Sequence, residues 1–248
     1  MVLESKKLFF KTIFLIFEDN KALEVMNSGR YSSVVIISRQ DFPLLSKYKR
    51  TKTTSVINLT IKMEEIFHKF NDTTRNEVRK TESMPDLKIV SEDLETALVY
   101  QLYKDFERIQ GRTPFPKGNM KDCLIFSAYF KGELISVMYV DKGGKDLRVR
   151  YIFSKRLKTN DPELYKIIGY ATKRLIWEVC LYGKRNNFLS LDMATVNFQD
   201  KNKEGITKFK MSFGGKLADE YTYIYKSKTF SYFEKLAILK NYLRKILN

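Results

Sequence analysis

The segment ITKFKMSFGG, residues 206–215, combines two lysines with regularly spaced apolar side chains and ends in two glycines. Ile206, Phe209 and Phe213 recur at spacings of three and four, which predicts a short helix with one buried stripe and a stop at the paired glycines. Lys210 lies off that stripe and faces either water or a ligand that needs a cation. Lys210 is therefore a candidate ligand-binding cation, with a solvated surface lysine as the alternative.

A second candidate is the carboxylate of Asp192, which ends the apolar run FLSLD. Open α/β sheets place ligands at the carboxyl edge of their strands, and partial burial there can suit a carboxylate to accept a proton. The alternative is a cap or turn aspartate. Asn197 and Asp200 follow in the next loop, and we expect Asn197 to contact a substrate on position alone.

A basic edge is expected on the segment TTRNEVRK, residues 73–80. Arg75 and Arg79 are separated by four residues and therefore share one face of a helix, with Asn76 beside them. Arginine side chains can hold a diphosphate or a nucleotide through paired hydrogen bonds. We expect these three residues to bind substrate, and a solvated charged face is the alternative.

Metal and disulfide chemistry receive little support from the sequence. The lone His68 has no cysteine or carboxylate at ligand spacing, so we predict no metal site. Cys123 and Cys180 lie in apolar surroundings, which predicts buried, reduced thiols in a cytoplasmic protein. The run LFFKTIFLIF is interrupted by Lys11 and is expected to form a strand and not a signal peptide. No apolar run approaches the roughly 20 residues of a membrane span, so we expect any membrane contact to be peripheral, at the inner face.

The charge of the chain favours anionic partners. Among 248 residues, 45 are Lys or Arg and 29 are Asp or Glu, which gives a formal net charge of +16. Such an excess attracts nucleic acid, phosphate-rich cofactors, nucleotide-linked substrates or an acidic membrane surface. The alternative cause is a lysine-rich genome. With 44% hydrophobic and 14% aromatic residues, the chain is expected to fold around a packed core.

The elements that position these residues follow from the hydrophobic periodicity. Three strand-like runs occupy the first sixty residues, and a helix is expected from Met63 to about Ser83. From residue 86 the expected order is strand, helix, three meandering strands, helix, strand, helix, strand, with a terminal amphipathic helix after it. The long helix is expected from Pro162 to Tyr182, with Asp161 as its N-cap and Gly183 as its stop.

Three segments resemble the Gcn5-related acyltransferase (GNAT) superfamily, and within it the Fem-type peptidoglycan-bridge aminoacyltransferases: TTRNEVRKTES at 73–83, YATKRLIWEVCLYGKRNNFLSLDMA at 170–194 and GITKFKMSFGG at 205–215. The pattern FK-x-x-FG, at residues 209–214, is the most distinctive. The resemblance implies a mixed α/β fold with a central, mostly antiparallel sheet and helices on both faces. It assigns residues 86–248 to this domain and residues 1–85 to a degenerate N-terminal partner lobe.

The resemblance also implies an acyl donor of the coenzyme A type, acetyl-CoA included. The superfamily holds the pyrophosphate of this donor with a glycine turn that opens the helix after the meander. The nearest match here is Lys166, Gly169, Tyr170 and Ala171, with Phe209 beside the donor. The lysine departs from the usual arginine or glutamine, and the acidic sequence DPE upstream opposes a phosphate if the helix begins there. The alternative is a glycine inside the helix, with the donor bound elsewhere.

The function implied by the resemblance is N-acyl transfer from acyl-CoA to an amine, on a nucleotide-linked amino sugar or an envelope-glycan precursor. In this reaction Lys210 stabilises the oxyanion and Asp192 accepts the amine proton. One alternative is aminoacyl-tRNA-dependent transfer to a peptidoglycan precursor. Another is a non-catalytic basic lobe that binds RNA or an acidic membrane.

Overall fold

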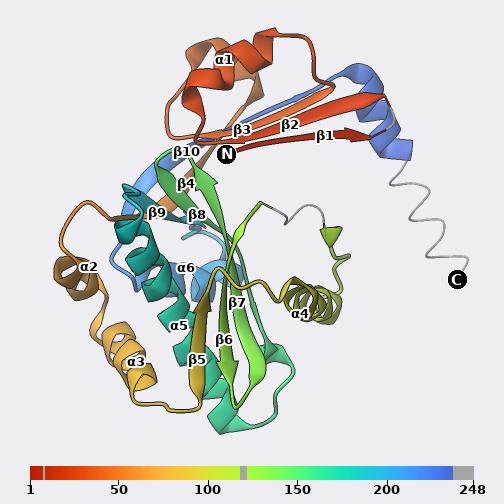
Figure 1. Cartoon of the computed structure of the whole chain (residues 1–248). Coiled ribbons are helices and arrows are strands. Elements are labelled where there is room, and N and C mark those ends of the chain that lie inside the picture. Colours follow the sequence, from red (N-terminus) through yellow and green to blue (C-terminus); the bar gives the residue numbers. More distant parts are fainter. Residues whose placement is uncertain (8, 118–121, 237–248) are drawn as a thin grey trace, which may run out of the picture. The chain divides into compact units, whose positions relative to one another are not determined.

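The computed structural model describes residues 1–7, 9–117 and 122–236 (Figure 1). The chain divides into two compact units, one formed by Met1–Lys52 with the segment from Asp219 onward, the other by Thr53–Ala218. It passes from one unit to the other within β4 (Lys49–Asn58) and β10 (Lys216–Lys226). The units do not follow the boundary expected near residue 85, because both ends of the chain contribute strands to the first unit.

The first unit is a sheet of strand order β1-β2-β3-β10, with β1 at Val2–Lys7, β2 at Phe10–Ile16 and β3 at Ser33–Ser38. β1 and β2 form an antiparallel hairpin, β2 runs parallel to β3, and β3 pairs antiparallel with β10. The core of this unit includes Leu15, Ile36 and Tyr223, packed with Ala22 of α1 (Asp19–Asn27) and with the 3-10 helix η1 (Pro43–Tyr48). Two of the expected strand-like runs form β2 and β3, whereas the sequence analysis expected neither β1 nor α1. Its sequence DNKALEVMN buries only Ala22, so it carries no long apolar stripe.

The second unit is a sheet of strand order β4-β9-β8-β7-β6-β5. Its remaining strands lie at Leu87–Ser91 (β5), Leu124–Phe130 (β6), Glu133–Gly143 (β7), Asp146–Ser154 (β8) and Ser190–Thr195 (β9). All neighbouring pairs from β5 to β8 are antiparallel, whereas β8 and β9 are parallel. The order of elements expected from residue 86 onward is therefore confirmed.

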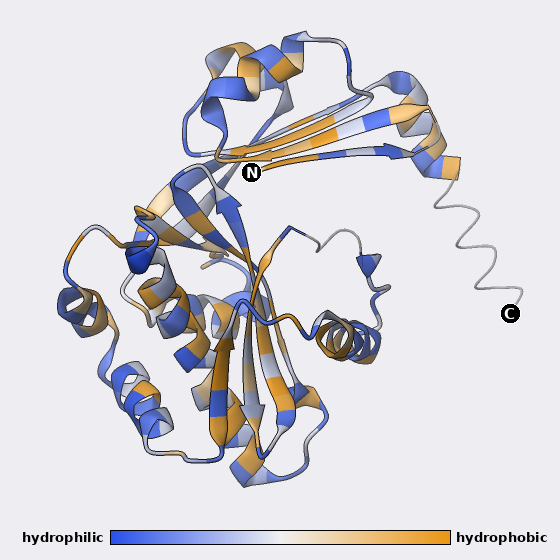
Figure 2. Ribbon diagram, viewed as in Figure 1, coloured by the Kyte–Doolittle hydropathy of each residue, from blue (hydrophilic) through white to orange (hydrophobic). Residues whose placement is uncertain are grey.

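Helices cover both faces of this sheet (Figure 1). The long helix α5 (Pro162–Arg185) packs with α2 (Met63–Lys69) and α3 (Asp72–Glu82) against the larger core. The helix α4 (Thr96–Ile109) packs on β7 and β8 around a second core of aromatic residues, which includes Tyr103 and Phe153. In Figure 2, α3 is largely hydrophilic, and it buries only Thr74, Val78 and Thr81. This arrangement is the mixed α/β fold with helices on both faces that the sequence predicts.

The expected helix from Met63 to Ser83 is broken into α2 and α3. The break lies at Asn71, whose side-chain oxygen accepts a hydrogen bond of 2.8 Å from the Thr74 N–H and so caps α3. The Arg75 guanidinium stabilises the end of α2, because it donates to the His68 carbonyl at 2.8 Å and to the Phe70 carbonyl. An asparagine that caps a helix stabilises its start by about 1 kcal/mol, which explains why the helical pattern restarts here.

The glycines after α6 (Glu204–Met211) have a second function besides ending the helix. Gly214 has φ +66°, and a Cβ there would lie 2.1 Å from the Lys69 carbonyl oxygen. Phe213 is buried as expected, but Ile206 is 55% exposed, so the predicted buried stripe is wrong at its first residue. The reason is that Ile206 lines a pocket, described below, and not the core.

Gly183 is not the expected helix stop, because α5 continues to Arg185. A Cβ at this position would lie 2.5 Å from Cδ1 of Leu59, so the residue permits close packing of α5 on the residue that follows β4. The expected N-cap is confirmed, since Asp161 Oδ1 accepts hydrogen bonds from Glu163 N–H at 2.8 Å and from Leu164 N–H at 3.3 Å.

Cys180 is buried, Cys123 is partly buried, and both are free thiols, as expected. The expected terminal helix is present over residues 228–236, and its remainder lies outside the described residues. Among the residues that the structure describes, no helix has the length and apolar character needed to cross a membrane.

Candidate functional site

The sheet of the second unit opens between its two parallel strands. β8 and β9 pair from Asp146 with Ser190 to Arg148 with Asp192, and no pair is formed beyond this point in the described strands. β8 continues to Ser154 and β9 to Thr195, so the two strands separate toward their carboxyl ends. Such a point in an open sheet exposes backbone groups to a ligand.

A pocket of about 680 Å³ lies at the open end of the split. Its walls come from the end of β8, the first half of α5, one residue of α3, and α6. The lining residues are Glu77, Ile152, Ser154, Arg156, Pro162, Tyr165, Lys166, Gly169, Tyr170, Thr172, Lys173, Gly205, Ile206 and Phe209. Four of the five residues predicted to bind the donor are among them. Ala171, the fifth, is buried behind the pocket wall.

The pocket combines cations with an apolar interior. The Arg156 guanidinium lies 4.0 Å from the centre of the Tyr165 ring, and Lys166 projects from the next position on α5. Lys173 pairs with Glu77 at 2.5 Å, so the one acid of the lining is neutralised. An anion with an apolar extension, such as an acyl group on a phosphate-bearing carrier, matches this lining.

The segment predicted to hold a pyrophosphate lies inside α5 and not at its start. Residues 166–171 begin four residues after the first residue of the helix, so their backbone N–H groups are bonded within the helix. The free N–H groups of the first turn are engaged by the Asp161 carboxylate. Only side chains of Lys166 and Tyr170 can therefore contact a ligand here, together with the open surface of Gly169.

Lys210 lies on α6, next to Phe209 of the pocket. Its ammonium group donates to the Thr195 carbonyl at 2.7 Å, at the last residue of β9. α6 begins shortly after β9, and the loop between them is held by Asn197, whose side-chain oxygen accepts from the Gln199 N–H at 2.9 Å and the Asp200 N–H at 3.1 Å. This loop brings a cation to the end of the split strand.

Asp192 lies at the last paired position of the split and is fully buried. Its Oδ2 pairs with the Arg148 guanidinium at 3.0 Å, and its Oδ1 accepts from the Ala194 N–H at 2.6 Å. Ala194 has φ +60°, a left-handed conformation that costs a non-glycine residue about 1 kcal/mol or more. The carboxylate therefore holds a strained bend in β9, besides the part in proton transfer that the sequence predicts for it.

The three predicted substrate-binding residues of α3 are separated from the pocket by their orientation. Arg75 pairs with Asp72 and caps α2, and Arg79 stacks on Phe67 at 5.3 Å. Asn76 is exposed. α3 meets the pocket through Glu77, which sequence reasoning did not select.

Sequence reasoning also missed Arg156 and Tyr165, which line the pocket, and Arg148, which pairs with Asp192. Arg148 and Arg150 alternate with apolar residues in RVRYIF, which reads as an exposed strand face. β8 carries a bulge at Arg150, since Tyr139 pairs with Tyr151 while Val140 pairs with Val149. The bulge places Val149 in the larger core and Tyr151 in the core under α4, although regular alternation would put both on one face.

The fold has relatives of known structure, although no protein-family model and no curated protein matches the sequence. FemX aligns with a TM-score of 0.63 and 12% identity over 94% of this chain and 86% of its own. L-PGS from Bacillus licheniformis aligns at 0.54 and 13%, over 92% of this chain and 81% of its own. The C-terminal domain of a putative lysylphosphatidylglycerol synthetase from Agrobacterium fabrum aligns at 0.52 and 10%, over 91% and 81%. The chain has a GNAT-like fold of the Fem type, as its sequence predicts.

Proposed function

We propose that the Thr53–Ala218 unit transfers an acyl group from a phosphate-bearing carrier to an amine. The observation that supports this function best is the split between β8 and β9 with a cationic, partly apolar pocket at its open end. Arg156 and Lys166 contact the phosphate of the carrier, and the acyl group extends past Phe209 toward the end of β9. The similarity in fold to FemX and to the synthetase domain supports a transferase.

In the proposed reaction, the amine nitrogen attacks the acyl carbonyl and a C–N bond forms. The bond between the acyl carbon and the carrier then breaks, and the carrier leaves with the electron pair. Lys210 stabilises the negative charge on the carbonyl oxygen, for which its ammonium turns from the Thr195 carbonyl. Asp192 accepts the amine proton through a water molecule, because its buried carboxylate does not line the pocket.

The start of α5 favours aminoacyl-tRNA over acyl-CoA as the carrier. Coenzyme A presents a pyrophosphate, which the superfamily holds with free N–H groups at a helix start, and Asp161 occupies those groups here. The 3′ end of a tRNA presents single phosphodiesters, which separate side-chain cations such as Arg156 and Lys166 can hold. The net charge of +16 is also suited to a polynucleotide.

The acceptor amine is proposed to belong to an envelope-glycan precursor, either a peptidoglycan precursor or a nucleotide-linked amino sugar. Of the residues predicted to bind substrate, Asn197 is the one proposed to contact it, because Arg75, Asn76 and Arg79 of α3 do not line the pocket. The support for Asn197 is its place in the loop between β9 and α6, where its side chain accepts from the Asp200 N–H.

Two experiments on the full chain test this function. Thermal unfolding with acyl-CoA and with aminoacyl-tRNA identifies the carrier, since a ligand of the native state raises the melting temperature. A shift with aminoacyl-tRNA and none with acyl-CoA is expected, and the reverse would return the carrier to acyl-CoA. No effect of either would contradict the transfer function.

The second experiment measures transfer by Lys210→Met, with Lys208→Met as the control on the same helix. Lys208 pairs with Glu204 at 2.6 Å on the exposed side of α6. Loss of an oxyanion donor lowers turnover by about 100-fold or more, whereas the control is expected to keep full turnover. Equal turnover in the two variants would remove Lys210 from the mechanism.

A further inference from the structure

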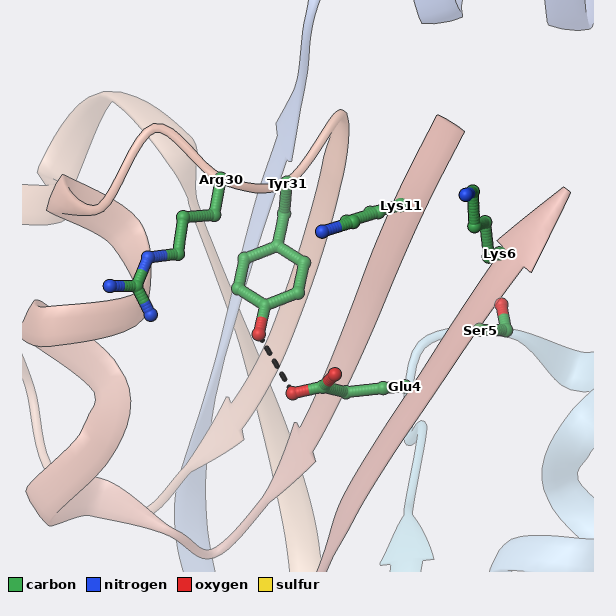
Figure 3. A pocket seen from close by; sticks show the side chains of 6 residues that line it. All are labelled: Glu4, Ser5, Lys6, Lys11, Arg30 and Tyr31. Atoms are coloured by element: carbon green, nitrogen blue, oxygen red, sulfur yellow. Dashed lines mark hydrogen bonds between the residues drawn. The ribbon is translucent and has the colours of Figure 1, made fainter. Parts of the chain in front are cut away.

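The first unit carries a cationic pocket near the turn end of its β1–β2 hairpin. The pocket has a volume of about 460 Å³ and is open to solvent. It is lined by Glu4, Ser5, Lys6, Lys11, Arg30 and Tyr31 (Figure 3). Three neighbouring segments therefore bring cations together: β1, β2 and the residues before β3.

These cations are placed where they repel one another. Lys6 and Lys11 lie directly opposite each other in the antiparallel register of β1 and β2, which destabilises a sheet. The one carboxylate of the pocket, Glu4, accepts a hydrogen bond of 2.7 Å from the Tyr31 hydroxyl, as Figure 3 shows. In the described part of the chain, none of Lys6, Lys11 and Arg30 forms an ion pair. The pocket thus has an excess of positive charge that an anion would balance.

An exposed apolar side chain lies at the tip of the same hairpin. Phe9, in the turn between β1 and β2, is 75% exposed, and it lies two residues from Lys11. Its ring lies 4.5 Å from Phe10, which in turn contacts Phe230 at 5.3 Å on the helix 228–236. That helix exposes Tyr232 by 67% and Leu236 by 48%. Exposed aromatic and aliphatic residues beside cations are typical of surfaces that enter the headgroup region of a bilayer.

We propose that the β1–β2 hairpin tip and the helix 228–236 dock on an anionic lipid surface. Lys6, Lys11 and Arg30 contact lipid phosphates, while Phe9 and Leu236 enter the region between the headgroups and the acyl chains. RNA also offers phosphates, but it gives no reason for an exposed leucine, which has no aromatic face for a base. The lipid surface is therefore the partner that accounts for both groups of residues.

The test is co-sedimentation of the full chain with vesicles, without any acyl donor. Phosphatidylcholine vesicles containing phosphatidylglycerol are expected to bind the protein, and pure phosphatidylcholine vesicles are expected to bind it weakly. At the usual contribution of a cation near such a surface, replacing Lys6, Lys11 and Arg30 by Gln weakens binding roughly 100-fold. Phe9→Ser is expected to weaken it roughly 10-fold.

Matched controls remove the same charge and the same kind of side chain from the second unit. Gln replaces three exposed cations there, Lys88, Arg108 and Lys142, and Ser replaces the exposed Leu94. These variants are expected to bind vesicles as the wild type does. Equal losses in the control and the hairpin variants would show nonspecific charge attraction and overturn the proposal.

An RNA-binding assay tests whether these cations bind RNA instead of lipid. If the hairpin variants lose tRNA binding while vesicle binding is unchanged, the surface binds RNA and the proposal is wrong. Because vesicle binding is measured without transfer, failure of the proposed transfer function leaves this test intact. Thermal unfolding of each variant shows whether it is folded, and all substituted side chains are at the surface, so we expect unchanged melting.

Discussion

The pair formed by Asp192 and Arg148 gives a direct prediction for stability. The two side chains are 1% and 10% exposed, and their charged atoms lie 3.0 Å apart. Asp192→Asn keeps the shape of the side chain and an oxygen for the Ala194 N–H, but it removes the negative charge beside the buried Arg148 guanidinium. Breaking a buried pair in this way costs about 3 to 5 kcal/mol of unfolding free energy.

Urea unfolding of four proteins measures this cost: the wild type, Asp192→Asn, Arg148→Met, and the double variant. The double variant removes both charges. Its loss of unfolding free energy is therefore expected to be smaller than the sum of the losses in the two single variants. Glu204→Gln breaks an exposed pair on α6 and is expected to leave the unfolding curve unchanged.

The same variants distinguish the structural role of Asp192 from its proposed catalytic role. If Asp192 also accepts the amine proton, turnover stays about 100-fold or more below the wild type in the double variant, although its stability is partly restored. A single variant Asp192→Asn that loses less than about 1 kcal/mol would refute the role of the pair in holding β9. Recovery of turnover in the double variant would remove Asp192 as the proton acceptor.

Three further predictions follow from other residues. Gly214→Ala is expected to lower the melting temperature more than Gly132→Ala. Both positions have positive φ, but only at Gly214 would a Cβ meet a carbonyl oxygen, at 2.1 Å. Equal losses of melting temperature would contradict this. Burial raises the pKa of the Asp141 carboxyl above its ordinary 3.8, so the native state binds this proton more tightly than the unfolded state does. Its contribution to stability therefore falls as pH rises from that value through the native pKa, and a pH series of urea unfolding should flatten in Asp141→Asn. Burial raises the pKa of the Cys123 thiol to about 12 and also that of Cys180, so a thiol reagent at mildly alkaline pH should label the native chain far more slowly than the unfolded one.

The fold of the second unit could be predicted from sequence because its signals are local. Alternating strands with glycine turns define the meander, and the Asp161 cap with Pro162 defines the start of α5. The break at Asn71 was also encoded locally, as an asparagine followed by Thr74, but the charged helical pattern on both sides conceals it.

The candidate site was only partly predictable. Lys166, Gly169, Tyr170 and Phe209 line one pocket, but they do so from the surfaces of two helices and not from a glycine turn at a helix start, and donor binding by them stays a prediction. The partners of Asp192 and Lys210 depend on strand register and on a bulge, which pattern reasoning does not resolve. Ile206 illustrates the same limit, because a residue that lines a pocket and a residue that packs in the core give the same helical spacing.

We propose that the pocket beside the split between β8 and β9 binds the acyl donor, and Gly205 offers the most direct test of this proposal. Gly205 lines this pocket, and a side chain at that position would extend into open space. Gly205→Trp is therefore expected to fill the pocket without unfolding the chain, and Lys208→Trp on the exposed side of the same helix is the matched control. The decisive measurement is the affinity for aminoacyl-tRNA of these two variants. We expect Gly205→Trp to abolish the binding of the aminoacyl end and Lys208→Trp to leave it unchanged. Unchanged binding by a folded Gly205→Trp would show that this pocket does not hold the donor.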